Sequence, residues 1–474
     1  MLKVRFGFYV IFLVALMGTP SWAIPLADSV VVLAKVRSKK DNQISFSEWK
    51  PFTSNTIGEA LSSTKQNAVA INKYGSSTEL KTKATGFFRT EKINEKWWSI
   101  DPEGYAGLHI AMNSVQQGKS NRNTQNFKTQ FGTDEKWIDA TAKLLVANGF
   151  NGTGSWSETD QIIAWNKQSD KPLAYTIMLN FMSQYGSERG GTHQEAGHKG
   201  YPNNTIFVFD AKFEASCDRV AKELVKYKND KNLYGYFTDN ELPFSINNLE
   251  SYLSLPNKKD EGYLAAKKWI DDRGINPEQP TEKNKAEFLA FEADRYFSIV
   301  SKSIRKYDPN HMCLGSRFYS GEKNIPEFMA AVGKYIDVIS INYYGVWTPS
   351  AKSMQNWEKW SQKPFIITEF YVKAEDSGLA NQSGAGWIVK NQADRGLFYQ
   401  NYCLGLLASK DCIGWHWFKY QDNDPSYTKA DPSNNDANKG IVDNNYQLYT
   451  PLLQKMNTLN NNRFIILNSF NKSN

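Results

Sequence analysis

The chain has 474 residues, of which 41% are hydrophobic, so it can bury a large core and is too apolar to be disordered. Its formal net charge is +7, but the basic residues do not cluster, and no helix-turn-helix, RNA-binding or zinc-finger pattern occurs. Nucleic acid is therefore not an expected partner.

The first 23 residues are typical of a secretory signal peptide. Lys3 and Arg5 precede an apolar run from Phe6 to Met17, and residues 21–23 read Ser-Trp-Ala, a small-x-small cleavage site near Ala23. The run is too short to cross a bilayer, and no other stretch reaches about 20 apolar residues. We expect a periplasmic or secreted protein without a membrane span. Its net charge is +5 after cleavage, because two basic residues and no acidic ones are removed from +7.

Residues 24–104 are expected to form a small β-rich extension ahead of the main domain. They are polar and irregular over most of their length. Two short apolar segments, residues 86–89 and 96–104, predict a β-hairpin that leads into the main domain.

From residue 105 onward, short apolar segments alternate with stretches of helical periodicity, and amphipathic helices are expected over residues 134–148, 287–307 and 394–409. The eight strand-like segments cover residues 107–114, 149–155, 173–181, 233–241, 311–319, 338–345, 365–371 and 413–420. This alternation predicts an α/β protein, a (β/α)8 TIM barrel over residues 105–474. A doubly wound open sheet is the alternative, but no Gly-rich phosphate turn follows the first strand.

Two of the eight predicted strands end in a glutamate. The fourth ends at Glu241, and the seventh ends at Glu369. The carboxyl ends of barrel strands carry the catalytic groups. A carboxylate at the end of an apolar strand costs free energy unless it is paired or used, and a structural salt bridge is an alternative for either residue alone. Together they favour the carboxylate pair that glycoside hydrolysis needs.

The motifs around these glutamates resemble a known group of enzymes. Asn240-Glu241 at the end of strand four, with Glu369 in Ile-Thr-Glu-Phe at the end of strand seven, is similar to clan A of the retaining glycoside hydrolases. Within the clan, the chain resembles glycoside hydrolase family 50, the β-agarases. The runs that carry this resemblance are residues 236–243, 368–378, 384–387, 392–400 and 414–424.

The resemblance implies roles for four residues. Glu241 would be the acid/base, Glu369 the nucleophile, and Asn240 would contact the 2-hydroxyl of the sugar. Residues 338–345 are similar to strand six of the clan, where a tyrosine steadies the nucleophile. Tyr343 is the better match for that tyrosine.

Aromatic residues make up 14% of the chain, which fits sugar stacking and a large core equally well. Trp415 and Trp417 lie on strand eight, where alternation should direct one face into the barrel mouth. A tryptophan there would stack on the sugar at the cleavage point, and a tryptophan that caps the core is the alternative. Trp156 follows strand two and is a further candidate for a sugar contact or a core residue.

Three polar residues at other strands are weaker candidates for substrate binding. Arg317 ends strand five, where it would orient Glu369 or bind a hydroxyl or sulfate, unless it forms a purely structural ion pair. His109 and Asn113 lie on strand one, and each fits a sugar contact and a polar core group equally well.

The cysteines and the acidic loops do not predict a metal site or another cofactor. Cys217, Cys313, Cys403 and Cys412 have no metal-ligand spacing, although Cys403 and Cys412 are candidates for a disulfide. His193, Glu195 and His198 lie in a Gly-rich loop without a supporting cysteine, which argues against zinc. The loop 422–443 is acidic but lacks EF-hand spacing, so a solvated loop is favoured over a calcium site.

The sequence therefore predicts a retaining glycoside hydrolase that acts on a β-linked red-algal galactan, agarose-like and sulfated or neutral, by double displacement. The expected partner is a polysaccharide or an oligosaccharide. Two alternatives stay open. One is another β-glycanase of the same clan, acting on mannan, glucan or a β-galactoside. The other is a barrel that binds carbohydrate without cleaving it.

Overall fold

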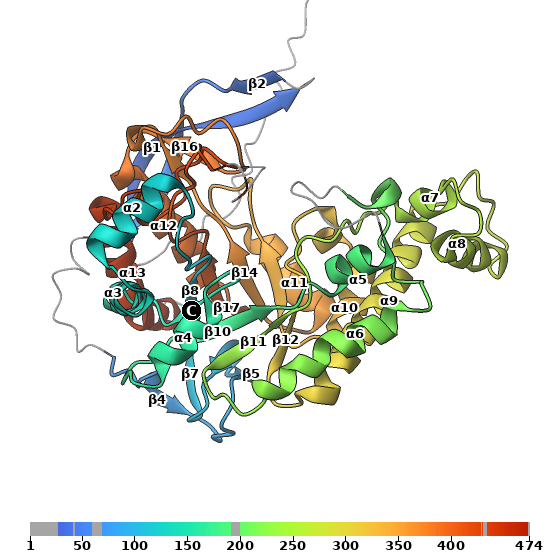
Figure 1. Ribbon diagram of the computed structural model, residues 1–474, viewed down its shortest axis with the longest axis horizontal. Coiled ribbons are helices and arrows are strands. Elements are labelled where there is room, and N and C mark those ends of the chain that lie inside the picture. Colours follow the sequence, from blue (N-terminus) through green and yellow to red (C-terminus); the bar gives the residue numbers. More distant parts are fainter. Residues whose placement is uncertain are drawn as a thin grey trace, which may run out of the picture.

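The computed structural model describes residues 27–40, 43–58, 69–190, 200–427, 429 and 434–472 (Figure 1). The predicted signal peptide, residues 1–23, lies outside these described residues. No helix within the described ranges is long and apolar enough to cross a membrane.

An eight-stranded parallel sheet forms the centre of the molecule. Its strands are β8 (His109–Met112), β9 (Gly152–Thr153), β10 (Ala174–Met178), β11 (Leu233–Phe237), β12 (Met312–Gly315), β13 (Ile339–Asn342), β14 (Phe365–Glu369) and β17 (Cys412–Trp417). The strand order is β12-β11-β10-β9-β8-β17-β14-β13. A parallel bridge between Phe318 and Ile341 joins the two ends, so the sheet is a nearly closed barrel. Seven of the eight predicted segments contain one of these strands, and the eighth overlaps β17, which begins one residue before it at Cys412.

Helices follow the barrel strands, and most of them pack around the barrel (Figure 1). They are α2 (Asn121–Gln130), α3 (Asp134–Ala147), α4 (Thr159–Asn166), α5 (Phe181–Arg189), α6 (Phe213–Ala221), α7 (Asn248–Leu253), α8 (Glu261–Asp271), α9 (Glu282–Tyr307), α10 (Pro326–Gly333), α11 (Ala351–Ser361), α12 (Gln392–Leu407) and α13 (Thr450–Lys472). The predicted helices at 134–148, 287–307 and 394–409 correspond to α3, α9 and α12. Helix α9 begins earlier than predicted because Thr281 and Asn284 form a capping box.

The barrel interior is a packed core. Tyr234 and Phe237 of β11, Leu314 of β12, Ile366 of β14 and Ile413 of β17 belong to one buried cluster inside the barrel. A larger buried cluster fills the layer between the strands and the helices. The parallel strands are therefore buried on both faces, by the cluster inside the barrel on one face and by the layer under the helices on the other.

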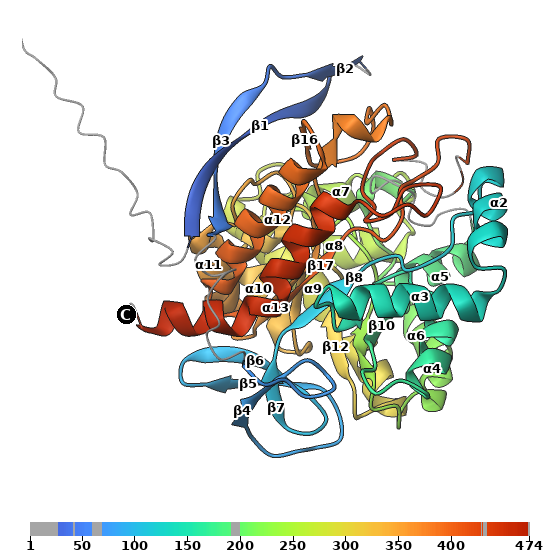
Figure 2. The same cartoon turned by 90° about the vertical axis from the view of Figure 1, so that its left-hand side faces the viewer.

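The residues before the barrel form sheets at its two ends (Figure 2). At one end, β4 (Ser77–Lys81), β5 (Arg89–Ile93), β6 (Lys96–Ile100) and β7 (Tyr105–Gly107) make an antiparallel sheet. Strands β5 and β6 form a hairpin, as predicted, but its first strand begins at Arg89 rather than spanning residues 86–89. The backbone N–H of Trp97 donates to the carbonyl of Lys410, just before β17, so this sheet covers the amino-terminal end of the barrel.

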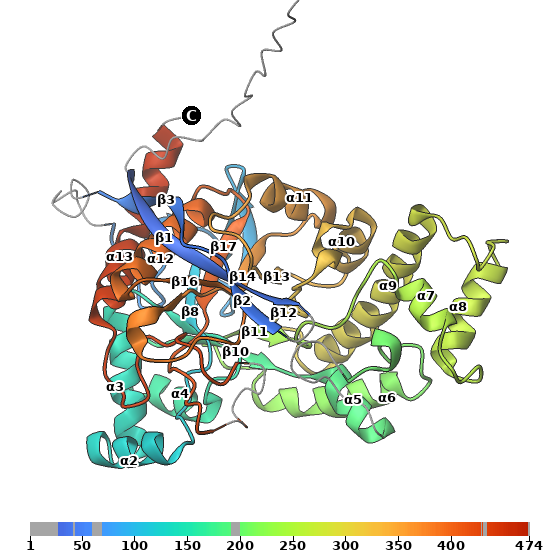
Figure 3. The ribbon, with the colours of Figure 1, turned by 90° about the horizontal axis from the view of Figure 1, so that it is seen from above.

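The other sheet lies at the carboxyl end of the barrel strands (Figure 3). It contains β1 (Ala27–Lys40), β2 (Gln43–Phe46), β3 (Lys50–Ile57), β15 (Lys373–Ala374) and β16 (Trp387–Val389). Strand β1 pairs with β16 in the connection between β14 and α12. The first strand is thus tied to the segment that follows Glu369.

The four cysteines are buried free thiols. The disulfide considered between Cys403 and Cys412 is therefore not formed. Cys412 begins β17 on the face that packs against the helices, and Cys403 lies in α12, so both thiols contribute to the same buried layer.

Candidate active site

Glu241 and Glu369 both lie at the carboxyl end of the barrel. Glu369 is the last residue of β14, and Glu241 follows β11, with its backbone N–H donating to the carbonyl of Ser316 at 3.0 Å. The backbone is left-handed at Trp156, Glu241 and Arg317, with φ of 59°, 51° and 51°. This conformation costs about 1–3 kcal/mol at a non-glycine residue and is typical of functional sites.

Both carboxylate oxygens of Glu369 have partners. Its Oε1 lies 2.8 Å from Nη2 of the fully buried Arg317, and its Oε2 accepts a hydrogen bond of 2.6 Å from the hydroxyl of Tyr344. Burial and the neighbouring Glu369 raise the pKa of Tyr344 well above its usual range, so the phenol keeps its proton and donates. A cation and a hydroxyl thus fix the carboxylate in one orientation.

Glu241 has a different environment. Its Oε1 accepts a hydrogen bond of 2.6 Å from Nδ2 of Asn342. Burial, and then the charge of Glu369, raise the pKa of Glu241 to about 8. The raised pKa favours the protonated form of Glu241, which is the state that a general acid requires.

Asn240 lies between these two groups. Its Oδ1 accepts from Nη1 of Arg317 at 2.7 Å and from Nδ2 of Asn342 at 3.3 Å. Arg317 also donates to the backbone carbonyl of Thr368 at 3.0 Å. Of the roles predicted for Arg317, its ion pair with Glu369 supports the orienting one.

The tyrosine that contacts Glu369 is Tyr344, and Tyr343 was the wrong choice. Strand β13 ends at Asn342, and the next two side chains point in different directions. The hydroxyl of Tyr343 accepts from the backbone N–H of Ser350 at 3.4 Å, and its ring packs edge-on against Trp357 of α11. Tyr343 is thus part of the core between β13 and the helices.

Trp415 and Trp417 are completely buried and face the helices, so neither can stack on a sugar. Trp415 Nε1 donates to the hydroxyl of Tyr399 in α12, and Trp417 Nε1 donates to the carbonyl of Lys439. The pairing of β14 with β17 shifts register between Cys412 and Trp415. This irregularity interrupts the regular alternation of the strand, and the face that carries the two tryptophans is not directed into the barrel mouth as predicted.

Other aromatic side chains line the mouth instead. Their rings form a chain of contacts, with centroid distances of 5.9, 6.1, 5.3 and 6.0 Å between successive members. The members of this aromatic arc are, in order, Trp156, Phe418, Tyr371, Tyr344 and Tyr319. Each follows a different barrel strand, and Trp156 is 37% exposed with Arg317 stacked 4.4 Å from its ring. Of these five residues, the sequence predicts a sugar contact only for Trp156.

His109 and Asn113 lie beneath the mouth as buried polar groups. His109 Nδ1 and His416 Nε2 are 2.8 Å apart, and the ring of His109 stacks on Tyr234 at 3.9 Å. Burial lowers the pKa of His109 to about 4, so the imidazole is neutral. Asn113 Nδ2 donates to the carbonyl of Thr368 at 2.7 Å. Both residues support strands rather than project into the mouth.

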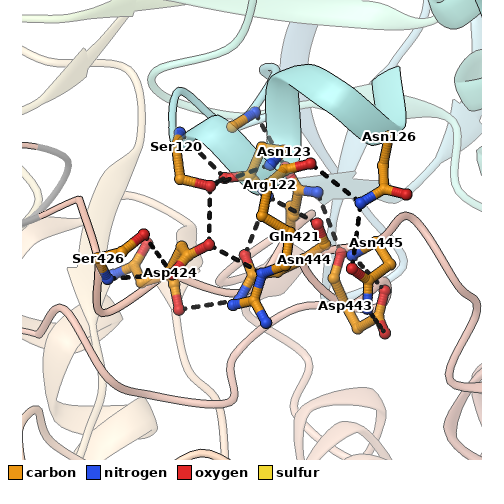
Figure 4. Close-up of polar contacts among 12 residues, drawn as sticks. Ser120, Arg122, Asn123, Asn126, Gln421, Asp424, Ser426, Asp443, Asn444 and Asn445 are labelled. Carbon is orange, nitrogen blue, oxygen red and sulfur yellow. Dashed lines mark hydrogen bonds and ion pairs between the residues drawn. The ribbon is translucent and has the colours of Figure 1, made fainter. Parts of the chain in front are cut away.

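The acidic loop after β17 is held by hydrogen bonds. Asp424 accepts from Ser120, Arg122 and Ser426, and so ties the loop to the start of α2 (Figure 4). Asp443 accepts hydrogen bonds from the backbone N–H groups of Asn445 and Gln447, which follow it closely in the sequence. The chain's own donors thus satisfy these carboxylates, which favours the hydrogen-bonded loop over a calcium site.

No group of three or more His, Cys, Asp or Glu side chains is placed to hold a metal ion within the part of the chain that the structure describes. The loop with His193, Glu195 and His198, considered above for zinc, lies outside the described residues.

No family model matches this chain, but curated protein sequences and solved structures do. Beta-agarase B of Vibrio sp. (strain JT0107) is 26% identical over 491 residues, which cover 81% of this chain and 49% of that protein. Beta-agarase A of the same strain is 27% identical over 398 residues, which cover 73% and 38%. The chain is homologous to β-agarases. It spans about half the length, or less, of these two relatives.

Among solved structures, the crystal structure of BpGH50 matches over 93% of this chain and 96% of that chain, with 29% identity and a TM-score of 0.80. An exo-beta-agarase matches over 86% and 69%, with 20% identity and a TM-score of 0.68. At that identity the second match shows a shared fold. The first match covers both chains almost entirely.

Proposed function

We propose that this protein is a retaining glycoside hydrolase that cleaves a β-linked, agarose-like galactan by double displacement. The observation that carries the proposal is the unlike environment of two carboxyl groups at one barrel mouth. Glu369 is paired with Arg317, and the pKa of Glu241 is raised to about 8. Glycoside hydrolysis needs these two states, an ionised nucleophile and a protonated acid.

In the first step, Glu369 attacks the anomeric carbon while Glu241 gives its proton to the leaving oxygen. Arg317 and Tyr344 keep the two carboxylate oxygens of Glu369 in place during the attack. The bond from the anomeric carbon to the leaving oxygen breaks, and a covalent glycosyl ester on Glu369 forms. The charge of Glu369 disappears in this step, which lowers the pKa of Glu241, so Glu241 stays ionised after giving up its proton and is ready to take one from water.

In the second step, Glu241 takes a proton from water, and the water oxygen attacks the anomeric carbon. The ester bond to Glu369 breaks, and the sugar leaves with its original anomeric configuration. Glu241 is again protonated and Glu369 is again ionised. No cofactor takes part in this scheme.

Homology to β-agarases supports an agarose-like substrate. The aromatic arc supports a sugar chain more generally, because flat rings stack on the apolar faces of sugars and Trp156 is accessible at the mouth. The panel of polysaccharides given below tests whether the galactan is sulfated.

We also propose a specific barrel type, domain boundaries and a location for this protein. The nearly closed barrel would be a clan A (β/α)8 TIM barrel over residues 105–474, preceded by the β-rich extension of residues 24–104. Residues 1–23 would be a signal peptide, so that the enzyme acts in the periplasm or outside the cell, where polysaccharide is found. Amino-terminal sequencing of the exported protein would locate the cleavage, expected near Ala23.

The two alternatives predict different results in one experiment. Agarose, porphyran, carrageenans, mannan and β-glucan are incubated with the protein, and release of reducing ends is measured. The proposal expects release from agarose or a related galactan, whereas another β-glycanase would release sugar from mannan or glucan. Glu241→Gln and Glu369→Gln should abolish release while the melting temperature stays close to wild type. Binding of a galactan without any product would support the non-catalytic barrel.

A further inference from the structure

Asn342, which the sequence analysis did not single out, connects the strand ends that carry the two glutamates. It is the last residue of β13 and is completely buried. Its Nδ2 lies 2.6 Å from Oε1 of Glu241 and 3.3 Å from Oδ1 of Asn240. Its Oδ1 accepts from the hydroxyl of Thr368 at 2.8 Å. Both ends of the amide are therefore engaged.

The hydrogen-bond partners determine which way the amide of Asn342 faces. Oδ1 of Asn240 accepts from Arg317, a group that can only donate, so this atom is an oxygen. The nitrogen of Asn342 therefore faces two oxygens, and its carbonyl faces the hydroxyl of Thr368. The reverse orientation would place the carbonyl of Asn342 against Oδ1 of Asn240 and leave the amide nitrogen against the hydroxyl.

This orientation restricts where Glu241 can carry a proton. An amide nitrogen has no lone pair that accepts a hydrogen bond, so a proton on Oε1 cannot point at Asn342. Oε1 instead accepts the short N–H bond, and the proton resides on Oε2. We propose that Asn342 is a positioning residue that places the acid proton of Glu241 on Oε2, from which it passes to the leaving group. The inference rests on the proposed function.

Removing the amide has two expected consequences. The proton of Glu241 then distributes between its two oxygens, so the acid is presented correctly less often. The pKa of Glu241 also rises, because a hydrogen bond that favours its ionised form is lost. A side chain that only supports the fold would produce neither effect.

The test compares two substrates that differ in their need for an acid. One is an agaro-oligosaccharide, whose leaving sugar must be protonated, and the other is its 2,4-dinitrophenyl β-glycoside, whose leaving group needs no proton. For Asn342→Ala we expect kcat/KM to fall about 100-fold on the first and less than about tenfold on the second. The basic limb of the pH profile should move to higher pH. Equal losses on both substrates with an unmoved limb would overturn the inference.

Thr368 offers a matched pair of variants that leave Asn342 itself in place. Thr368→Val removes the hydroxyl that orients the amide and should give the same leaving-group dependence in weaker form. Thr368→Ser keeps the hydroxyl and should return the basic limb to the wild-type position. Equal limbs in the two variants would contradict the orienting role. If Asn342→Ala does not fold, Asn342→Asp replaces it, and the limb should again move to higher pH.

Glu241→Gln and Glu369→Gln, measured in parallel, separate this inference from the proposed function. If either glutamine variant keeps near-normal turnover of the oligosaccharide, the proposed function fails. If both are inactive but Asn342→Ala affects the two substrates equally, the proposed function stands and the role of Asn342 is refuted.

Discussion

Arg317 and Glu369 form a buried ion pair at the mouth of the barrel, with 2.8 Å between Nη2 and Oε1. The same guanidinium donates to Oδ1 of Asn240 at 2.7 Å and to the carbonyl of Thr368 at 3.0 Å. One side chain thus joins the ends of three strands, β11, β12 and β14. The nucleophile is thereby held in a fixed position relative to the segment that carries Glu241.

Replacing Arg317 should separate its geometric role from its charge. Lysine keeps the charge but cannot present a planar fork to three acceptors, so Arg317→Lys should lower kcat about 10–100-fold. Arg317→Ala leaves the buried carboxylate of Glu369 unpaired, which should destabilise the fold by about 3–5 kcal/mol. Steady-state kinetics and urea unfolding measure the two effects. Full activity in the lysine variant would argue that charge alone matters.

Substitutions of the two adjacent tyrosines after β13 should differ sharply in their effect on kcat. Tyr344→Phe removes the hydrogen bond to Oε2 of Glu369, and a bond to a charged group is worth about 1.5–3 kcal/mol, so kcat should fall about 10–100-fold. Tyr343→Phe removes only a long contact to a backbone N–H and should change kcat less than about twofold. A larger loss in the Tyr343 variant would reassign the tyrosine that steadies the nucleophile.

Trp156 should contribute to substrate binding. It is 37% exposed at the mouth, next to Phe418 and above Arg317. Trp156→Ala should raise KM for an agaro-oligosaccharide about tenfold, which corresponds to about 1.4 kcal/mol. Phe291 of α9, 38% exposed and away from the barrel mouth, is the matched control. A KM that rises equally in Phe291→Ala would point to a general loss of structure.

Glu292 in α9 should make stability depend on pH. It is completely buried, and burial raises its pKa from 4.5 to about 7. The hydroxyl of Tyr252 lies 2.6 Å from the carbonyl of Ile206 and 2.9 Å from Oε1 of Glu292, but it has one proton to donate. A protonated Glu292 resolves this conflict, because it donates to Tyr252 while Tyr252 donates to Ile206.

Between about pH 4.5 and 7 the folded protein therefore binds a proton at Glu292 that the unfolded chain has lost. The free energy of unfolding falls as pH rises through this window and levels off above it. Glu292→Gln supplies the donor permanently, so it should be more stable than wild type at pH 8, by on the order of 2 kcal/mol, and similar at pH 5. Glu287→Gln, at a partly exposed position on the same helix, is the control. A constant difference between wild type and Glu292→Gln at both pH values would refute this account.

The barrel and the two glutamates were predictable because their signals are local. Eight apolar segments have the length of strands, and Glu241 and Glu369 are found where two of them end. The pairing of β1 with β16 was not predictable, because it joins residues near 35 to residues near 388 across the whole barrel.

The orientation of single side chains depended on irregular backbone that the sequence does not reveal. The register shift before Trp415 turned both tryptophans of β17 toward the helices. Adjacent tyrosines after Asn342 could not be told apart, because strand alternation stops where the strand ends. The sequence offered one indication that Tyr319, Tyr371 and Phe418 lie at the mouth, because each follows the end of a barrel strand.

The anomeric configuration of the first product tests the central claim most directly. Proton NMR of agarose oligosaccharide hydrolysis, recorded before mutarotation equilibrates the products, distinguishes the two configurations at the new reducing end. If Glu369 is a nucleophile and Glu241 an acid/base, the β configuration of the substrate appears first, and the α form follows slowly. Initial appearance of the α form would contradict the account, because it would mean that water attacks directly and that neither glutamate forms a covalent intermediate.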